Sequence, residues 1–377
     1  MSKRKKPLNP FIYEGYECKE YFCDRKEETE TLISNLSNGR NTTLVSPRKM
    51  GKTGLIMHVF ETIKSQNEDA ICIYVDIFHT QNQHDFIQAL GRAIVQEHLI
   101  NKHRRKNKFM QFLGALRPSF SIDPQTGTPS ISVDIDKSNT EHSIQSIFNL
   151  LDGIGEDVYI AIDEFQTITD YPEKGTEALL RSYIQFIHNV HFIFSGSKMH
   201  LMYEMFGSPK RPFYQSTSIL SLSPLHEEIY YEFSKSFFEA QKLTFSKDIF
   251  HELYHGFGGH TWYIQSILNR LYESGKSVTE ASQLQEAIQS IVKEKSAQYE
   301  SLTVLLTPNQ FTLLKAIAEE GRHCLPLSKS FSERHTIPPA GSLKRTLDFL
   351  SDKELVYRSK EGYIVYDHFM GIWLRNL

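Results

Sequence analysis

The hydrophobic pattern along the chain predicts a sheet of buried strands that alternate with helices. Four runs are apolar without alternation, over residues 42–46, 70–78, 157–165 and 190–197. Such continuous runs are typical of strands that are covered on both faces. Apolar residues at helical spacing follow Lys52 and recur over residues 84–101, 142–151 and 177–188. Strands that alternate with helices in this way predict an α/β fold with a parallel sheet.

The rest of the chain contains an insertion and two further domains. Residues 119–136 alternate apolar and polar positions on both sides of a Pro/Gly turn, which predicts an inserted hairpin. After residue 226 the pattern is helical without a convincing strand, and the C-terminal part ends in two short strands around a Lys-Glu-Gly turn. We therefore expect a core domain over residues 1–222, a helical domain over 223–299 and a third domain over 300–377. The basic first dozen residues are expected to be mobile or to drape over the core.

Composition narrows the class of protein. The 377 residues are 40% hydrophobic and 23% charged, which is enough for two or three domains with real cores. The net charge of −3 excludes a globally basic protein that coats nucleic acid. The four cysteines form no Cys-x-x-Cys pair, so neither a disulfide framework nor a cysteine zinc site is indicated. No apolar run reaches the ~18 residues of a membrane span, and we expect a soluble, reduced, cytoplasmic protein without a membrane partner.

The segment SPRKMGKTG (residues 46–54) carries the clearest chemical signal. It lies between an apolar strand and an amphipathic helix, where backbone N–H groups and the helix N-terminus bind the phosphates of nucleotides. The phosphate-loop pattern asks for glycine at its first position, where this chain has Ser46 followed by Pro47. Gly51, which most needs to lack a side chain, is present. The tripeptide Gly-Lys-Thr is common by chance, so it is the strand–loop–helix context that favours a nucleotide site.

Two later strands end in residues that suit such a site. Asp163 ends an apolar strand, so its carboxylate is expected beside the loop at the carboxyl edge of the sheet, where it can hold magnesium. Glu164 points another way and can reach a water near the γ-phosphate. An isolated Asp-Glu pair is usually a solvated strand end, but the loop favours the functional interpretation. Ser195 and Ser197 end the fourth strand, and either can contact the γ-phosphate or the attacking water, or only mark a turn.

These motifs occur in an order that resembles a known family. The segments are YFCDRKEETETLISNL, SPRKMGKTGL, IAIDEFQTI, FIFSGSK, RPFYQST and GFGGHTWYIQ. The set is similar to the archaeal-type ATPases of the STAND branch of AAA-like P-loop proteins, from about residue 9 to the C-terminus. The resemblance implies a P-loop NTPase core of the additional-strand class, a helical lid and a C-terminal winged helix. It also implies ATP and Mg²⁺ as ligands, and slow, switch-like hydrolysis.

The resemblance assigns roles by position. It implies that Lys52 contacts the β- and γ-phosphates, that Thr53 and Asp163 bind Mg²⁺, and that Glu164 is the hydrolytic base. The remaining loop residues are expected around the nucleotide, and these are Pro47, Arg48, Lys49, Met50, Gly51 and Gly54.

Three further residues are assigned from weaker motifs. Arg25 lies in DRKEE, which resembles the family's Gly-Arg-Glu-x-Glu element near the adenine although its two neighbours depart from that pattern. GFGGHT resembles the lid motif that approaches the nucleotide, with His260 as the contact and Thr261 in place of the usual proline. Arg211 can act as an arginine finger on a neighbouring subunit's γ-phosphate, or can be a surface residue in a Pro-rich loop.

Two basic stretches raise the question of nucleic acid. NKHRRKNK (residues 101–108) can neutralise phosphates, but charge runs are commonly solvated helix ends. The C-terminal segment resembles a winged helix with Lys344 and Arg345 on the recognition helix and with Arg358 and Lys360 on the wing. An aspartate on the same helix and an apolar C-terminus support a protein contact as strongly as the basic residues support DNA. DNA and a protein partner therefore stay open.

The leading hypothesis is a magnesium-dependent ATPase whose nucleotide state sets the orientation of the lid and the winged helix, with an oligomer possible in the ATP state. The alternative is a DNA-binding regulator that keeps ATP as a bound structural ligand. A small-molecule kinase needs a second substrate pocket that the sequence does not indicate. No ordered helicase motif follows the Asp-Glu pair.

Overall fold

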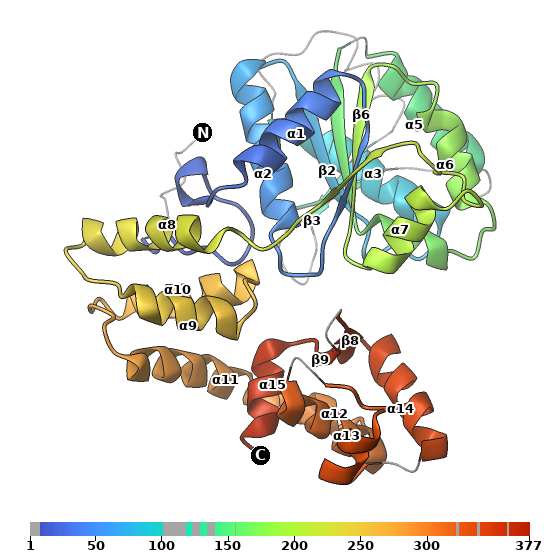
Figure 1. Cartoon of the computed structure of the whole chain (residues 1–377). Helices are drawn as coiled ribbons and strands as arrows, with labels where there is room; N and C mark the ends of the chain where they lie inside the picture. Colours follow the sequence, from blue (N-terminus) through green and yellow to red (C-terminus); the bar gives the residue numbers. More distant parts are fainter. Residues whose placement is uncertain are drawn as a thin grey trace. The chain divides into compact units, whose positions relative to one another are not determined.

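The computed structural model describes residues 8–100, 118–122, 129–133, 140–154, 156–321, 324–337, 340–359 and 362–377. The chain forms two compact units (Figure 1). The sheet unit comprises Glu14–His226, and the helical unit joins Glu227–Leu377 to the N-terminal segment, of which residues 8–13 are described. The basic run 101–108 and Lys360 lie outside the described residues. Within the described part, no helix has the length and hydrophobicity that a membrane crossing requires.

The sheet unit is built around five parallel strands. They are β1 (Thr42–Val45), β2 (Ile71–Asp76), β5 (Val158–Asp163), β6 (Val190–Gly196) and β7 (Ser218–Ser221). Their order is β2-β5-β6-β1-β7, with every pair parallel. Since β6 lies between β1 and β5, the sheet has the additional-strand arrangement that the resemblance implies. The predicted α/β fold with a parallel sheet is confirmed.

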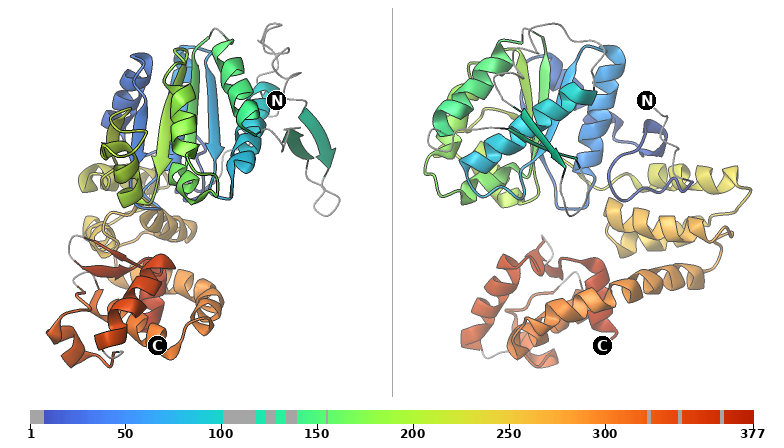
Figure 2. Two further views of the ribbon diagram at one scale, coloured as in Figure 1. Left: turned by 90° about the vertical axis from the view of Figure 1, so that its right-hand side faces the viewer. Right: turned by 180° about the vertical axis from the view of Figure 1, so that it is seen from behind.

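Helices cover both faces of the sheet (Figure 2). The helices of one face are α1 (Lys26–Ser37) and α2 (Lys52–Gln66). The helices of the other face are α3 (Gln83–Ile100), α5 (Thr140–Asp152), α6 (Thr176–Ile184) and α7 (Met199–Gly207). Along β5, Ile160 and Ile162 face the second group, whereas Tyr159 and Ala161 face the first. This double burial explains why the central strands carry apolar residues on both faces rather than at alternate positions only.

The expected hairpin is present between α3 and α5. Its strands, β3 (Pro118–Ile122) and β4 (Pro129–Val133), pair antiparallel. The structure also contains elements that the hydrophobic pattern did not predict, namely the 3₁₀ helix η3 (Phe165–Asp170), α7 and β7.

The helical unit contains the expected helices and a short antiparallel hairpin. Its first helices are α8 (Glu227–Ala240), α9 (Lys247–Gly256), α10 (Thr261–Glu273) and α11 (Ala281–Val304). They are followed by α12 (Pro308–Glu320), α13 (Lys329–Arg334), α14 (Ala340–Asp352), β8 (Val356–Arg358), β9 (Tyr363–Val365) and α15 (His368–Arg375). Thr307 caps α12 in a capping box ahead of Pro308, which explains why a helix begins there. The pair β8–β9 forms the wing of the predicted winged helix.

The described N-terminal residues pack in the helical unit. The Phe11 side chain is fully buried, with its ring centroid 5.7 Å from that of Phe237 and 5.5 Å from that of Tyr272. Asn9 Nδ2 donates to the Asn269 carbonyl at 2.8 Å, and Asn269 Nδ2 donates back to the Phe11 carbonyl at 2.9 Å. The expectation of a mobile segment, or one draped over the core, is therefore wrong for residues 9–12, because the rings of α8 and α10 bury Phe11.

Gly196, the last residue of β6, provides a test of the core packing. A β carbon at Gly196 would lie 2.3 Å from Gln166 Oε1 and 2.5 Å from Met202 Sδ, and both of these side chains are buried. We expect Gly196→Ala to lower the free energy of unfolding by about 1–3 kcal/mol, because buried neighbours must shift. Gly207→Ala is the control, since a β carbon there has no neighbour within 4 Å. Urea denaturation of both variants measures the difference, and equal midpoints would refute this account of Gly196.

Candidate nucleotide-binding site

The loop between β1 and α2 has the backbone of a phosphate-binding loop. Gly51 has φ 89° immediately before α2, a conformation that side chains rarely adopt. Lys49 has φ 66°, which is uncommon for a residue other than glycine. Ser46 is buried, and it is not among the described residues with positive φ. Serine therefore fits the position where the phosphate-loop pattern has its first glycine.

Lys52 places a buried ammonium group in this loop. It is the first residue of α2 and only 6% exposed. Its Nζ donates to the carbonyls of Ser46 and Pro47 at 3.0 and 3.3 Å. Burial lowers the pKa of Lys52, and the negative charges of Asp163 and Glu164 oppose that shift. Such an ammonium group is suited to an anionic ligand, because carbonyls alone do not balance its charge.

Hydroxyl groups from two elements, α2 and β2, converge on the Asp163 carboxylate of β5. Thr53 Oγ1 donates to Asp163 Oδ2 at 3.0 Å, and the Tyr74 hydroxyl donates to the same oxygen at 2.7 Å. Burial raises the pKa of Tyr74, and the charge of Asp163 raises it further. The Thr53 hydroxyl and the Asp163 carboxylate form the hard oxygen donor set that Mg²⁺ prefers, so these residues fit the implied metal. Sequence reasoning did not find Tyr74.

Glu164 is held by two donors in an unusual backbone conformation. Its φ and ψ are 55° and 41°, in the left-handed region, where non-glycine residues cluster at functional sites. Its Oε2 accepts from Ser197 Oγ at 2.7 Å and from Gln166 Nε2 at 2.5 Å. Asp76 adds a third carboxylate, and its pKa is raised by burial and by the charges of Asp163 and Glu164. Ser197 and Gln166 therefore orient the Glu164 carboxylate. The sequence analysis identified Ser197 but not Gln166.

The structure separates the two candidate serines. Ser195 lies within β6, is fully buried, and its hydroxyl has no hydrogen-bond partner in the described part of the chain. Ser197 lies just after β6 and contacts Glu164. Only Ser197 is therefore joined to the acidic end of β5.

We expect Ser197→Ala to lower the ATP turnover number by about tenfold or more, because a hydrogen bond to a charged group contributes about 1.5–3 kcal/mol. Ser195→Ala removes the same atom from the same segment and is expected to change turnover by less than about twofold. Steady-state phosphate release by the two variants tests this difference. Equal turnover by both variants would show that Ser197 does not position Glu164.

The DRKEE segment at the start of α1 contacts the loop through Arg25. This side chain is 5% exposed, and its Nη2 donates to the Met50 carbonyl at 3.5 Å. Its Nη1 pairs with Glu28 at 2.6 Å. Within the loop, the Arg48 guanidinium lies 5.2 Å from the centroid of the Phe78 ring. Arg25 and the phosphate-binding loop therefore form one connected structure.

Other predicted loop residues are also accounted for. Met50 is buried, and Pro47 contributes the carbonyl that accepts from Lys52. Gly54 faces the ring of Phe22, whose Cε2 would lie 3.5 Å from an added β carbon. The loop residues from Pro47 to Gly54 thus belong to one segment that surrounds the Lys52 side chain. Their contacts with a nucleotide stay predictions.

Arg211 has partners within its own chain. Its Nη2 forms an ion pair with Glu177 of α6, and its Nη1 lies 3.5 Å from Glu204 of α7. Both contacts are ion pairs within the sheet unit, as expected of a structural residue at its surface. A role as a finger for a neighbouring subunit stays a prediction.

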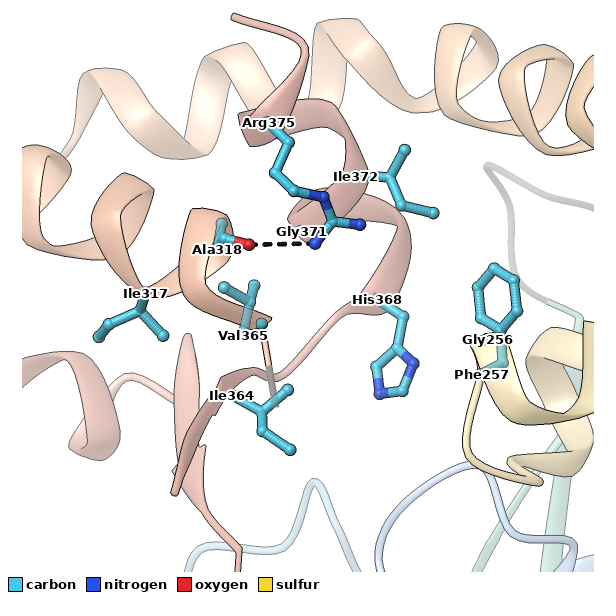
Figure 3. Close-up of a pocket in the computed structure, with 11 residues that line it drawn as sticks. Gly256, Phe257, Ile317, Ala318, Ile364, Val365, His368, Gly371, Ile372 and Arg375 are labelled. Atoms are coloured by element: carbon cyan, nitrogen blue, oxygen red, sulfur yellow. Dashed lines mark hydrogen bonds between the residues drawn. The ribbon is translucent and has the colours of Figure 1, made fainter. Parts of the chain in front are cut away.

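His260 belongs to the helical unit, where the lid motif meets the winged helix. The His260 ring centroid lies 5.0 Å from that of His368, and the Phe257 ring stacks on His368 at 6.0 Å. Figure 3 shows the pocket that these elements line, in which Arg375 donates to the Ala318 carbonyl at 3.0 Å. The lid motif is therefore packed directly on the winged helix. The nucleotide contact of His260 stays a prediction.

The basic residues of the winged helix are on its surface. Lys344 and Arg345 are exposed on α14, and Arg358 is exposed at the end of β8. They are available to a partner, whether that partner is DNA or a protein.

Comparisons with known proteins agree with this geometry. A family profile described as an ATPase domain predominantly from Archaea matches residues 22–267, and one described as a probable winged helix domain matches residues 297–376. No curated protein sequence is significantly similar to the chain.

Among solved structures, the chain resembles the Walker-type ATPase PABY2304 of Pyrococcus abyssi, with 18% identity and a TM-score of 0.64 over 97% of this chain and 99% of that one. It also resembles the ORC2 protein of Aeropyrum pernix in its ADPNP and ADP complexes, with 15% identity and a TM-score of 0.57 over 97% and 95%. The ORC1 protein of Aeropyrum pernix, in complex with DNA, shares 13% identity and a TM-score of 0.55 over 97% and 96%. These likenesses show the fold. With its profile match over residues 22–267, the chain belongs to the family of ATPase domains found predominantly in Archaea.

Proposed function

We propose that the protein is a magnesium-dependent ATPase that hydrolyses ATP slowly and whose nucleotide state sets the orientation of the helical unit. The observation that carries this proposal is the meeting of Lys52, Asp163 and Glu164 at the carboxyl edge of the sheet. Backbone amides and the α2 N-terminus would bind the phosphates, and the Lys52 ammonium would neutralise their charge. Thr53 and Asp163 would hold Mg²⁺, which supplies charge neutralisation at the phosphates when bound.

Glu164 is assigned as the general base. Its carboxylate would accept a proton from the attacking water, and the hydrogen bonds from Ser197 and Gln166 keep that carboxylate in one orientation. The strained backbone at Glu164 supports the assignment, because left-handed conformations of ordinary residues persist where surrounding contacts hold them at functional sites.

The switch proposal rests on the packing of the helical unit. Phe257 of the lid motif packs on His368 and Phe369 of α15. Tyr263 of α10 accepts from the His368 backbone amide at 3.2 Å. Because these contacts join the lid helices to the winged helix in one compact unit, a lid that responds to nucleotide would move the winged helix with it.

Steady-state phosphate release from ATP tests the proposal. Slow but sustained release that requires Mg²⁺ and stops with EDTA is the expected result. Tight retention of ATP without release would instead support the alternative, in which ATP is only a structural ligand. Absence of both binding and release would refute the nucleotide assignment.

The alternative, a DNA-binding regulator, is favoured by one feature of the helical unit. Lys344 and Arg345 are exposed on the helix that would enter a major groove, and Arg358 is exposed on the wing. The ORC1 protein, which shares the fold, was solved in complex with DNA. We therefore keep DNA as the second candidate ligand of the winged helix.

For this candidate, we expect the double variant Lys344→Ala/Arg345→Ala to weaken DNA binding. The slope of log affinity against log salt should fall by about one for each lost phosphate contact. The double variant Lys276→Ala/Lys293→Ala removes the same charge from exposed positions outside the winged helix, and should bind like the parent. Fluorescence anisotropy over a salt series measures both. An unchanged slope in the first variant would favour a protein partner.

A further inference from the structure

Three side chains of two neighbouring helices converge on the surface of the helical unit. His251 Nδ1 lies 2.7 Å from Glu227 Oε1, and His255 Nε2 lies 3.0 Å from Glu227 Oε2. The two imidazole rings are 4.2 Å apart between centroids. The three potential ligand atoms all lie within 4.8 Å of one another.

The helices hold these side chains in place. His251 and His255 are four residues apart on α9, so they share one face of that helix. Glu227 is the first residue of α8, which packs beside α9 (Figure 1). Buried aromatic rings fix this packing, with Tyr230 of α8 edge-on to Phe250 of α9 at 5.5 Å between centroids. The backbone that carries the cluster is therefore fixed by packing, although His251 and His255 are exposed and Glu227 is half-buried.

We propose that Glu227, His251 and His255 bind a Zn²⁺ ion that links α8 to α9. Two imidazole nitrogens and one carboxylate form the donor set of open zinc sites, in which water completes the tetrahedron. Zinc bonds of about 2.0–2.2 Å place ligand atoms about 3.3–3.6 Å apart. The two Glu227–histidine spacings of 2.7 and 3.0 Å would therefore open by several tenths of an ångström, and any ligand atoms that lie farther apart, up to 4.8 Å, would move closer.

Exposure and charge around the cluster are compatible with metal binding. The side chains of Glu227, His251 and His255 are 30%, 64% and 56% exposed, which lets water reach the ion. Lys247, four residues before His251 on α9, is paired with Glu228 at 2.5 Å. Because imidazole is a poor ligand for hard cations, the site should discriminate against Mg²⁺ and Ca²⁺.

The test uses the full chain after EDTA treatment and dialysis, titrated with ZnCl₂ against a chromophoric chelator. The parent should bind one zinc ion at this site. His251→Ala/His255→Ala should bind it at least about tenfold more weakly, and Glu227→Gln, which keeps a hydrogen-bond acceptor, should also lose about tenfold. His188→Ala/His200→Ala removes two exposed histidines of the sheet unit and should bind zinc like the parent.

A second readout does not depend on counting ions. Zinc should raise the unfolding temperature of the parent and of the His188→Ala/His200→Ala control, but not that of His251→Ala/His255→Ala. Circular dichroism checks that each variant is folded. Equal zinc affinity in the parent and the His251→Ala/His255→Ala variant would overturn the proposal, as would absence of zinc binding in the parent. Either result would identify the cluster as a hydrogen-bonded network without a metal.

Discussion

Lys52→Ala is expected to weaken ATP binding by more than an order of magnitude. The ammonium group of Lys52 is buried, and its present partners are the carbonyls of Ser46 and Pro47. Triphosphate oxygens would be stronger partners, because they carry negative charge that attracts the ammonium group, whereas the two carbonyls are neutral. Losing a buried charged partner costs about 2–5 kcal/mol, so the Kd should rise by about 30-fold to several thousand-fold.

Calorimetric titration of Lys52→Ala with ATP and Mg²⁺ measures this change. Lys174→Ala is the matched control, because it removes an exposed lysine of the same unit and should leave the Kd unchanged. Both variants should give the circular dichroism spectrum of the parent. A folded Lys52→Ala variant with the affinity of the parent would remove the phosphate-binding role from this loop.

Glu164→Gln is expected to keep ATP binding and to remove turnover. Glutamine has nearly the shape of glutamate and can accept the same hydrogen bonds from Ser197 and Gln166, but it cannot accept a proton from water. Since general base catalysis contributes about 10²–10⁴-fold, the turnover number should fall by at least about 100-fold. The Kd for ATP should change by less than about threefold, because Glu164 is not assigned to the phosphates.

Phosphate release and ATP titration on the same preparation separate the two quantities. Glu156→Gln makes the same substitution at an exposed position before the other end of β5, and should behave like the parent. Parental turnover in Glu164→Gln would exclude Glu164 as the base. A parallel loss of binding and turnover would assign it to ligand binding instead.

The central part of the fold was predictable from the sequence because its strands are buried on both faces. Residues such as Ile160 and Ala161 face opposite layers of helices, so the apolar run is continuous and easy to recognise. The edge strand β7 was missed because its burial alternates and two of its four residues are serines. It is a strand because it pairs with β1, which is a tertiary contact that periodicity cannot reveal.

The candidate site was predictable where motif and chemistry coincide in one segment. The loop, Asp163 and Glu164 each follow a recognisable strand. Tyr74 was missed because its contact with Asp163 depends on the register of β2 against β5. Gln166 was missed because its contact with Glu164 depends on the left-handed backbone conformation of Glu164, which the residue order does not reveal.

The N-terminal segment shows a further limit of reading a single sequence. Phe11 follows a proline-punctuated basic stretch, which indicates an exposed tail. Its ring is nevertheless buried between α8 and α10, more than 200 residues away along the chain. A contact at such separation leaves no local pattern.

The most direct test of the nucleotide assignment is calorimetric titration of the folded parent protein with ATP in the presence of Mg²⁺. We predict saturable heat that fits one site per chain. An absence of heat with both ATP and GTP, on protein shown to be folded, would contradict the assignment.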